Sequence, residues 1–173
     1  MKAKLIKFLM LVVLCGAQTM VAENSNQPTR GTRSYTTVGA PAPDVDLYDA
    51  KGNKHRLSEF KGKYVYLDLW ASWCGPCNLE IPYMKELERA LGNEMVVFVA
   101  ISVDEDVDSW KAALARHKLE GNQFIASPIL PQLLKLYSIP RYMIYDKEGK
   151  LVNANAPRPS SGEVIKQILS GLK

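Results

Sequence analysis

The stretch that decides the fold is residues 64–82, which read YVYLDLWASWCGPCNLEIP. Its first seven residues, Tyr64–Trp70, form a continuous apolar run rich in aromatic and branched side chains, which predicts a strand buried on both faces. A helical pattern follows, so that Cys74 and Cys77 lie where the strand gives way to a helix. Two thiols at this spacing close into a small disulfide ring and reopen with little backbone motion. This is the chemistry of thiol–disulfide exchange.

Around this stretch, strand and helix patterns alternate as in an α/β domain. A second apolar run, Met95–Val103, predicts another buried strand, and residues 77–91 carry apolar side chains at helical spacing. Such a βαβ unit makes a right-handed crossover between parallel strands. Hairpin signals flank the unit at 45–57 and 141–154, and Asp104 is expected to cap a further helix.

The position of Cys74 favours a reactive thiolate. A cysteine at the start of a helix faces unpaired backbone N–H groups and the positive end of the helix dipole, which both stabilise a thiolate. Such cysteines have pKa values lowered to roughly 3.5–7.5 from about 8.5. Cys77 lies one turn inside the helix and is expected to be more buried. We therefore expect Cys74 to attack a substrate disulfide, Cys77 to resolve the mixed disulfide, and Trp73 to cover the pair.

Two carboxylates are candidate proton acceptors for Cys77. Asp68 lies in the first predicted strand, where an unpaired buried carboxylate tends to keep its proton. The alternative for Asp68 is a place near the end of the sheet with access to water. Glu80 is one turn past Cys77 and could perform the same task. The alternative for Glu80 is a solvated position on the helix.

The N-terminus has the pattern of an export signal. Lysines among the first seven residues precede a short apolar core, Phe8–Leu14, and small residues follow up to Ala22. The apolar run is too short for a comfortable transmembrane helix. Lipoprotein processing at Cys15, which would leave a lipid anchor on that residue, is the alternative to ordinary cleavage.

Length and composition suit one globular domain. The chain has 173 residues, of which 47% are hydrophobic and 23% charged. We expect residues 1–22 to be the signal peptide, 23–38 a flexible linker without periodicity, and 39–173 the folded domain. The formal net charge is +4, but the basic residues are scattered and aromatic residues do not interleave with them. This pattern argues against nucleic-acid binding.

Other chemistries of a C-x-x-C pair fit less well. A zinc or copper module is the alternative from a different class, but zinc usually takes four ligands, and His55 and His117 lack ligand spacing to the cysteines. We therefore expect no metal, no cofactor and no role for either histidine. A peroxidase of the peroxiredoxin kind would want a threonine where Ala71 stands.

Two motifs, taken together, resemble a known family. Cys74 to Pro82 follow the pattern C-x-x-C-x-x-E-x-P, and residues 138–150 read SIPRYMIYDKEGK. These segments resemble the thioredoxin superfamily, and in particular its TlpA/ResA-like exported branch, with a likeness that runs from about Gly39 to the C-terminus. The resemblance implies an α/β thioredoxin fold. Its central mixed sheet would be flanked by helices and carry an N-terminal β-hairpin extension and an insertion after the third strand.

The resemblance also implies roles for site residues. Pro140 matches the superfamily's cis-proline, although the residues alone would favour an ordinary trans proline at the start of a strand. The backbone of Ile139 would pair with the substrate chain as an added strand. Glu80 aligns with the branch's active-site glutamate and Asp68 with the buried aspartate of cytosolic thioredoxins. Which of the two moves the proton stays open.

The direction of exchange follows from the dipeptide between the cysteines. Gly75-Pro76 is the thioredoxin type, which is reducing at about −270 mV, against about −120 mV for the oxidant DsbA. The expected activity is therefore reduction of disulfides in protein substrates in the periplasm or cell envelope, with a membrane electron donor. We expect a monomer. A disulfide oxidant or isomerase of the same fold is the alternative.

Overall fold

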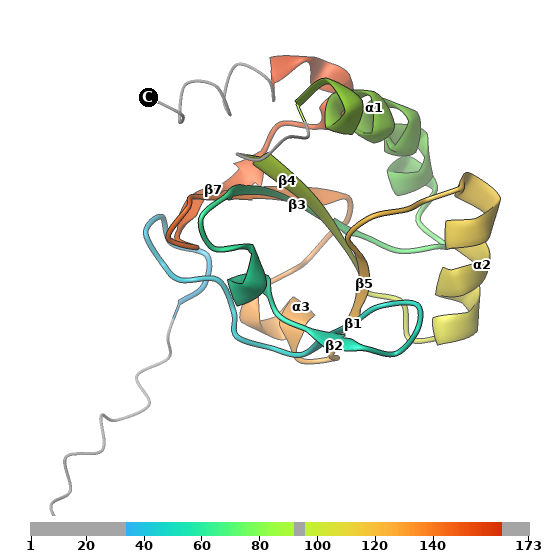
Figure 1. Cartoon of the computed structure of the whole chain (residues 1–173), viewed down its shortest axis with the longest axis horizontal. Helices are drawn as coiled ribbons and strands as arrows, with labels where there is room; N and C mark the ends of the chain where they lie inside the picture. The colour runs from blue at the N-terminus through green and yellow to red at the C-terminus, as the bar shows by residue number, and fades with distance from the viewer. Residues whose placement is uncertain (1–33, 92–95, 164–173) are drawn as a thin grey trace, which may run out of the picture. The chain divides into compact units, whose positions relative to one another are not determined.

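The computed structural model describes residues 34–91 and 96–163. Within them, seven strands form one mixed sheet in the order β2-β1-β5-β4-β3-β6-β7 (Figure 1). The strands are β1 (Leu47–Tyr48), β2 (Lys54–His55), β3 (Tyr64–Trp70), β4 (Val96–Ser102), β5 (Gln123–Ala126), β6 (Arg141–Tyr145) and β7 (Leu151–Ala156). The helices are α1 (Gly75–Leu91), α2 (Val107–His117) and α3 (Leu130–Leu133), with short 3₁₀ turns η1 (Leu57–Phe60) and η2 (Pro159–Ser161).

The strand directions confirm the predicted α/β architecture. β3 runs parallel to β4 and antiparallel to β6, and β4 runs parallel to β5. The β1–β2 hairpin joins the sheet through an antiparallel pairing of β1 with β5. β3, α1 and β4 thus form the expected crossover unit, and the N-terminal hairpin extends the sheet as the resemblance implied. The chain between β4 and β6 holds α2, β5 and α3.

The strand that precedes the cysteines lies in the interior of the sheet. Neighbouring strands pair with β3 on both sides over most of its length, so its end cannot shift easily. At that end Leu69 pairs with Arg141, the first residue of β6, and the Val103 N–H donates to the Trp70 carbonyl. The C-terminal ends of β3 and β4 and the start of β6 therefore lie next to one another at the same end of the strands, where the C-x-x-C segment begins.

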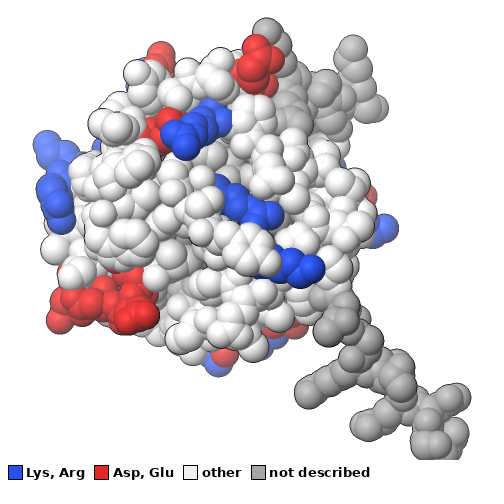
Figure 2. Space-filling model, turned by 180° about the vertical axis from the view of Figure 1, so that it is seen from behind, with Lys and Arg blue, Asp and Glu red and all other residues white. Residues whose placement is uncertain are grey.

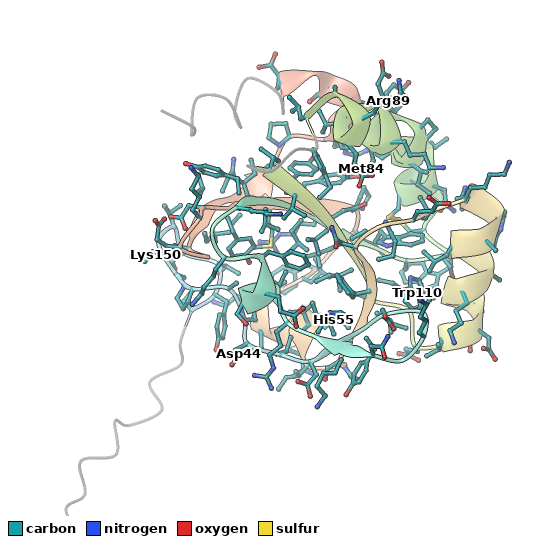
Figure 3. The ribbon with its side chains drawn as sticks, in the orientation of Figure 1. Asp44, His55, Met84, Arg89, Trp110 and Lys150 are labelled. Carbon is teal, nitrogen blue, oxygen red and sulfur yellow. A yellow bond between two sulfur atoms is a disulfide. The ribbon has the colours of Figure 1, made fainter. Side chains whose placement is uncertain are left out.

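Alternate residues of β3 supply the two faces of the sheet, as in any strand. Val65, Leu67 and Leu69 belong to a core cluster that includes Leu130 and Leu134 from the α3 region. Tyr66 belongs to the cluster on the other face, where α1 packs. Figure 3 shows Met84 on the side of α1 that faces the sheet, and Trp110 likewise on α2. Because α1 is fixed by this packing, the helix start that carries the cysteines is held against the sheet.

One local expectation, the cap of α2, is wrong. The N-cap of α2 is Asp106, whose carboxylate accepts the N–H groups of Asp108 and Ser109, and not Asp104. Asp104 is instead buried at the end of β4. Tyr35, which the linker prediction includes, packs against the core cluster of the domain. The signal peptide, Cys15 and the linker up to residue 33 lie outside the described residues.

The surface agrees with the scattered charges noted in the sequence. On the face shown in Figure 2, the Lys and Arg side chains are separated by uncharged surface and do not form one continuous patch. In residues 34–91 and 96–163, no helix has both the length and the apolar character needed to cross a bilayer.

Candidate active site

Cys74 and Cys77 form a disulfide at the start of α1, with their Cα atoms 5.2 Å apart. β3 ends at Trp70, and a tight turn follows in which the Cys74 N–H donates to the Ala71 carbonyl. The Cys74 carbonyl then accepts the N–H of Asn78, a bond of the first helical turn. Cys74 thus stands at the N-cap position of the helix, where side chains accept otherwise unpaired N–H groups.

The sulfur of Cys74 takes the part of a capping atom. The Cys77 N–H donates to Cys74 Sγ at 3.2 Å. In the disulfide this sulfur is neutral, and in the reduced protein the same position would hold the thiolate. A backbone donor and the positive end of the helix dipole both favour negative charge there. The geometry is the one that the sequence predicted for a nucleophilic Cys74.

The predicted difference in burial between the two cysteines is absent. Cys74 is 4% exposed and Cys77 is 3% exposed, so both are buried in the disulfide form. Burial therefore does not separate the attacking thiol from the resolving thiol. What distinguishes Cys74 is the hydrogen bond that its sulfur accepts.

Trp73, which the sequence predicts to cover the cysteines, is largely exposed. Its side chain is 69% exposed. The tryptophans that pack in one cluster with Cys74 and Cys77 are instead Trp70 and Trp110, both fully buried. Trp70 is the last residue of β3, and Trp110 lies in α2. Trp73 lies in the turn between β3 and α1.

The proline segment lies beside the disulfide. The Ile139–Pro140 peptide bond is cis, as the resemblance implied. Ile139 is partly buried and packs against the cluster that contains both cysteines. A hollow of about 250 Å³ opens next to Pro140, with Ser138, Tyr142 and Arg158 among its lining residues.

Asp68 occupies the face of the sheet that α1 covers. Its Oδ1 atom is buried and has no hydrogen-bond partner within the described part of the chain. Burial, and secondarily the charge of Glu80, raises the pKa of Asp68 to about 8. The carboxyl group is therefore mostly protonated at neutral pH, as expected for a buried carboxylate without a partner. Access to water, the alternative for Asp68, does not hold for this oxygen.

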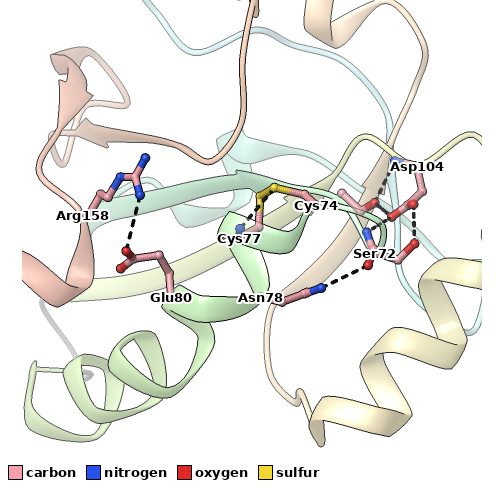
Figure 4. Close-up of a disulfide and its surroundings, with 8 residues drawn as sticks. Ser72, Cys74, Cys77, Asn78, Glu80, Asp104 and Arg158 are labelled. Atoms are coloured by element: carbon pink, nitrogen blue, oxygen red, sulfur yellow. Dashed lines mark hydrogen bonds and ion pairs between the residues drawn. A yellow bond between two sulfur atoms is a disulfide. The ribbon is translucent and has the colours of Figure 1, made fainter.

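Glu80 is buried rather than solvated, at 7% exposure. The Ser160 N–H donates to its Oε2 at 3.0 Å, and the Ser160 hydroxyl donates to its Oε1 at 2.9 Å. Arg158 approaches Oε1 at 3.8 Å (Figure 4). The segment that follows β7 therefore orients this carboxylate, although it is far from Glu80 in the sequence. Because the charge of Glu80 also raises the pKa of Asp68, the two acids act as neighbours.

A third acidic residue lies on the other side of the disulfide. Asp104 accepts the N–H and the hydroxyl of Ser72, at 2.8 and 2.7 Å, and also the hydroxyl of Ser102. The carbonyl of Ser72 accepts the side-chain amide of Asn78 at 3.3 Å. Ser72 precedes Cys74 and Asn78 follows Cys77, so these contacts connect both flanks of the pair (Figure 4).

Comparison with known proteins agrees with this geometry. The Redoxin family matches residues 37–168 of the chain. The chain belongs to the Redoxin family. Thiol-disulfide oxidoreductase ResA of Geobacillus thermodenitrificans is 33% identical over 148 residues, which cover 82% of this chain and 81% of the relative. ResA of Bacillus cereus is 30% identical over 170 residues, or 96% of this chain and 92% of the relative.

Solved structures give the same picture of this Redoxin-family chain. A crystal structure described as a thiol-disulfide oxidoreductase from Bacteroides vulgatus superposes with a TM-score of 0.74 at 39% identity, covering 79% of this chain and 98% of that one. A thiol:disulfide interchange protein DsbE from Chlorobium tepidum superposes with a TM-score of 0.66 at 30% identity, covering 79% and 99%. With the disulfide at the start of α1, the chain is a TlpA/ResA-like thiol-disulfide oxidoreductase with a thioredoxin fold.

The metal-binding alternative is not favoured. In residues 34–91 and 96–163, no group of three or more His, Cys, Asp or Glu side chains is arranged to hold a metal ion. His55 instead pairs with Glu59 and Asp49, which raise its pKa. Burial lowers the pKa of His117 at the end of α2.

Sequence reasoning missed the residues that hold the acids of this Redoxin-family site. Ser160 and Arg158 contact Glu80 from the segment that follows β7, and Ser72 and Ser102 contact Asp104. No local motif marks Ser160 or Arg158. For Ser102 and Asp104 the sequence did offer a signal, because both follow an apolar run that predicts a buried strand. Polar side chains at the end of such a strand need hydrogen-bond partners.

Proposed function

We propose that this oxidoreductase reduces disulfide bonds of protein substrates, with Cys74 as the attacking thiolate and Cys77 as the resolving thiol. The observation that carries the proposal is the hydrogen bond from the Cys77 N–H to Cys74 Sγ at the start of α1. A thiolate at this position is stabilised by the backbone donor and the helix dipole, and the thiolate is the nucleophile in exchange.

The reaction runs in two exchanges. The thiolate of reduced Cys74 attacks one sulfur of the substrate disulfide, forming a mixed disulfide and releasing the other substrate sulfur as a thiolate. Cys77 then gives up its proton and attacks Cys74 Sγ, which releases the second substrate thiolate. Two electrons have passed to the substrate, and the protein is left with the Cys74–Cys77 disulfide seen in the structure. A dithiol donor must supply two electrons before the next cycle.

Asp68 and Glu80 are the proposed proton acceptors for Cys77. Glu80 lies one helical turn beyond Cys77 and is held by Ser160, and Asp68 lies close enough for the charge of Glu80 to raise its pKa. A carboxyl group with a pKa of about 8 can accept and return a proton near neutral pH, which suits general acid–base catalysis. The arrangement supports a shared role in which the charge of Glu80 raises the pKa at which Asp68 takes up a proton.

The substrate is proposed to bind across Trp73, Ile139 and Pro140. Exposed tryptophan surface is typical of a protein-binding position, and Trp73 is the exposed aromatic residue next to Cys74. The backbone of Ile139 is proposed to pair with an extended substrate segment. The hollow beside Pro140 then accepts a side chain of that segment.

The proposed place of action is the periplasm or cell envelope. The signal pattern in residues 1–22 supports export, with either cleavage of the signal or lipid attachment at Cys15. Similarity to ResA and DsbE proteins supports a role as an exported thiol-disulfide oxidoreductase. A membrane protein is the proposed electron donor, since cytosolic reductants do not reach an exported domain directly. The domain is proposed to act as a monomer.

The test is a pair of cysteine variants with a matched control. Cys74→Ser should reduce turnover of a protein disulfide to the uncatalysed background. Cys77→Ser should accumulate a mixed disulfide through Cys74, seen by mass spectrometry of the non-reduced protein. Cys15→Ser is the control and should behave as the wild type in purified form. Normal turnover by Cys77→Ser would contradict the assigned roles, and a potential near that of DsbA would favour the oxidant alternative.

A further inference from the structure

Asp104 lies beside the redox segment and has no part in the proposed proton transfer. It is buried at the end of β4, where a carboxylate costs free energy unless it is hydrogen-bonded. Both of its oxygens accept hydrogen bonds: Oδ1 from the Ser72 hydroxyl, and Oδ2 from the Ser72 N–H and the Ser102 hydroxyl. Among the described residues, no Lys, Arg or His side chain forms an ion pair with it. Within residues 34–91 and 96–163, the hydrogen bonds that hold this carboxylate come from Ser72 and Ser102.

The partner of Asp104 connects the two flanks of the C-x-x-C segment. Ser72 donates two hydrogen bonds to Asp104, and its own carbonyl accepts the side-chain amide of Asn78. Ser72 lies two residues before Cys74, and Asn78 directly follows Cys77. Ser72, Asn78 and Asp104 thus form a clamp, which we call the Ser72 clamp. Its fixed end is β4, which is paired on both sides in the sheet.

We propose that Asp104 is a positioning residue for the redox step: through the Ser72 clamp it holds the two flanks of the cysteine pair in the geometry from which the disulfide closes. The inference rests on the proposed roles of Cys74 and Cys77. The step concerned is the second exchange, in which the Cys77 thiolate attacks Cys74 Sγ, the bond from Cys74 to the substrate breaks, and the substrate sulfur leaves as a thiolate.

Two physical effects of losing the clamp act in the same direction. A looser segment lowers the effective concentration of one thiol at the other, which disfavours ring closure and the disulfide form. Asp104→Asn also removes a buried negative charge that is hydrogen-bonded to the segment before Cys74, which favours the thiolate and stabilises the reduced form. Loss of the clamp should therefore make the disulfide easier to reduce and the resolving step slower.

The experiment compares Asp104→Asn and Ser72→Ala with Asp106→Asn. Asp106→Asn removes the same charge two residues away, and asparagine is an equally good N-cap for α2, so this control should leave the redox equilibrium within about twofold of the wild type. The equilibrium constant between dithiol and disulfide is measured in a glutathione or dithiothreitol redox buffer, by alkylation and intact mass. The rate of the resolving step is measured in single turnover.

Asp104→Asn should shift the equilibrium about tenfold toward the dithiol, which corresponds to about 30 mV for this two-electron couple, and should slow resolution by a similar factor. Ser72→Ala keeps the carboxylate and loses one hydrogen bond, so it should shift the equilibrium about threefold without lowering the pKa of Cys74. That pKa is followed by thiolate absorbance.

Folding is checked separately by near-ultraviolet circular dichroism. If Asp104→Asn does not fold, Ser72→Ala decides the question alone. Values within twofold of the wild type for the folded clamp variants would overturn the inference. The mixed disulfide trapped by Cys77→Ser would still form in that case. The proposed roles of the cysteines are therefore tested independently of the role of Asp104.

Discussion

The disulfide lies between two acidic regions that differ in how their oxygens are satisfied. On one side, Asp104 accepts three hydrogen bonds from Ser72 and Ser102 (Figure 4). On the other side, Glu80 accepts two from Ser160, while Asp68 has a buried oxygen without a partner. The first region is fully hydrogen-bonded, and the second is not.

This difference suits the two regions to different roles, with Asp104 positioning the cysteine segment and Asp68 exchanging a proton. Both oxygens of Asp104 accept hydrogen bonds from residues that flank the disulfide or follow β4, so this carboxylate suits a structural connection. A buried carboxyl group without a partner has a raised pKa, so it gains and loses a proton near neutral pH. The pKa of Asp68, raised to about 8, belongs to this second kind. Variants on the two sides should therefore differ in their pH dependence.

The largest effect is expected at Glu80. Glu80→Gln keeps the size of the side chain and an oxygen that can accept from Ser160, but it removes one of the two proposed proton acceptors. Release of the second substrate thiol in single turnover at pH 7 should slow about a hundredfold, a typical loss for general base catalysis. Glu86→Gln, an exposed change on the same helix, is the matched control and should have no effect. Equal rates for the two variants would remove Glu80 from the proton path.

Asp68 should make the stability of the oxidised protein depend on pH. Because the pKa of Asp68 is higher in the folded state, the folded protein binds this proton more tightly than the unfolded chain does. The stabilisation of the folded state by this proton is complete below the unfolded pKa of about 4 and is lost as pH rises through 8. Between pH 6 and pH 9 the wild type should lose about 3 kcal/mol more stability than Asp68→Asn. Urea unfolding at both pH values measures this difference.

Asp108→Asn, an exposed change on α2, is the control for Asp68→Asn and should keep the pH dependence of the wild type. The same slope in Asp68→Asn as in the wild type would show that Asp68 does not bind the proton.

The smallest effect is expected from the support of Glu80. Ser160→Ala removes the hydroxyl donor at 2.9 Å and leaves the backbone donor at 3.0 Å in place. We expect about a threefold decrease in the rate of the resolving step, in line with the loss of about 0.5–1 kcal/mol for one hydrogen bond. Ser161→Ala is the control, because the Ser161 hydroxyl donates to the Arg158 carbonyl and not to Glu80. A larger loss in the control would contradict the role of Ser160.

The sequence by itself determined the strand–turn–helix unit, the cysteine pair and the cis-proline segment, because each depends on residues close together in the chain or on a motif. The hydrophobic pattern predicts β3 as a buried strand, and the helical pattern after it predicts where α1 starts. Glu80 was identified from its position one turn past Cys77. These features are local, so one sequence is enough to predict them.

Only the tertiary structure decided how the site is held. The bonds of Asp104 to Ser72 and of Ser160 to Glu80 join residues 32 and 80 positions apart. The choice between Asp104 and Asp106 as a helix cap, the burial of Cys74 and the exposure of Trp73 depend on the same long-range packing. Hydrophobic spacing is set by neighbours in the chain, whereas the partner of a carboxylate is set by whichever strand or turn folds against it.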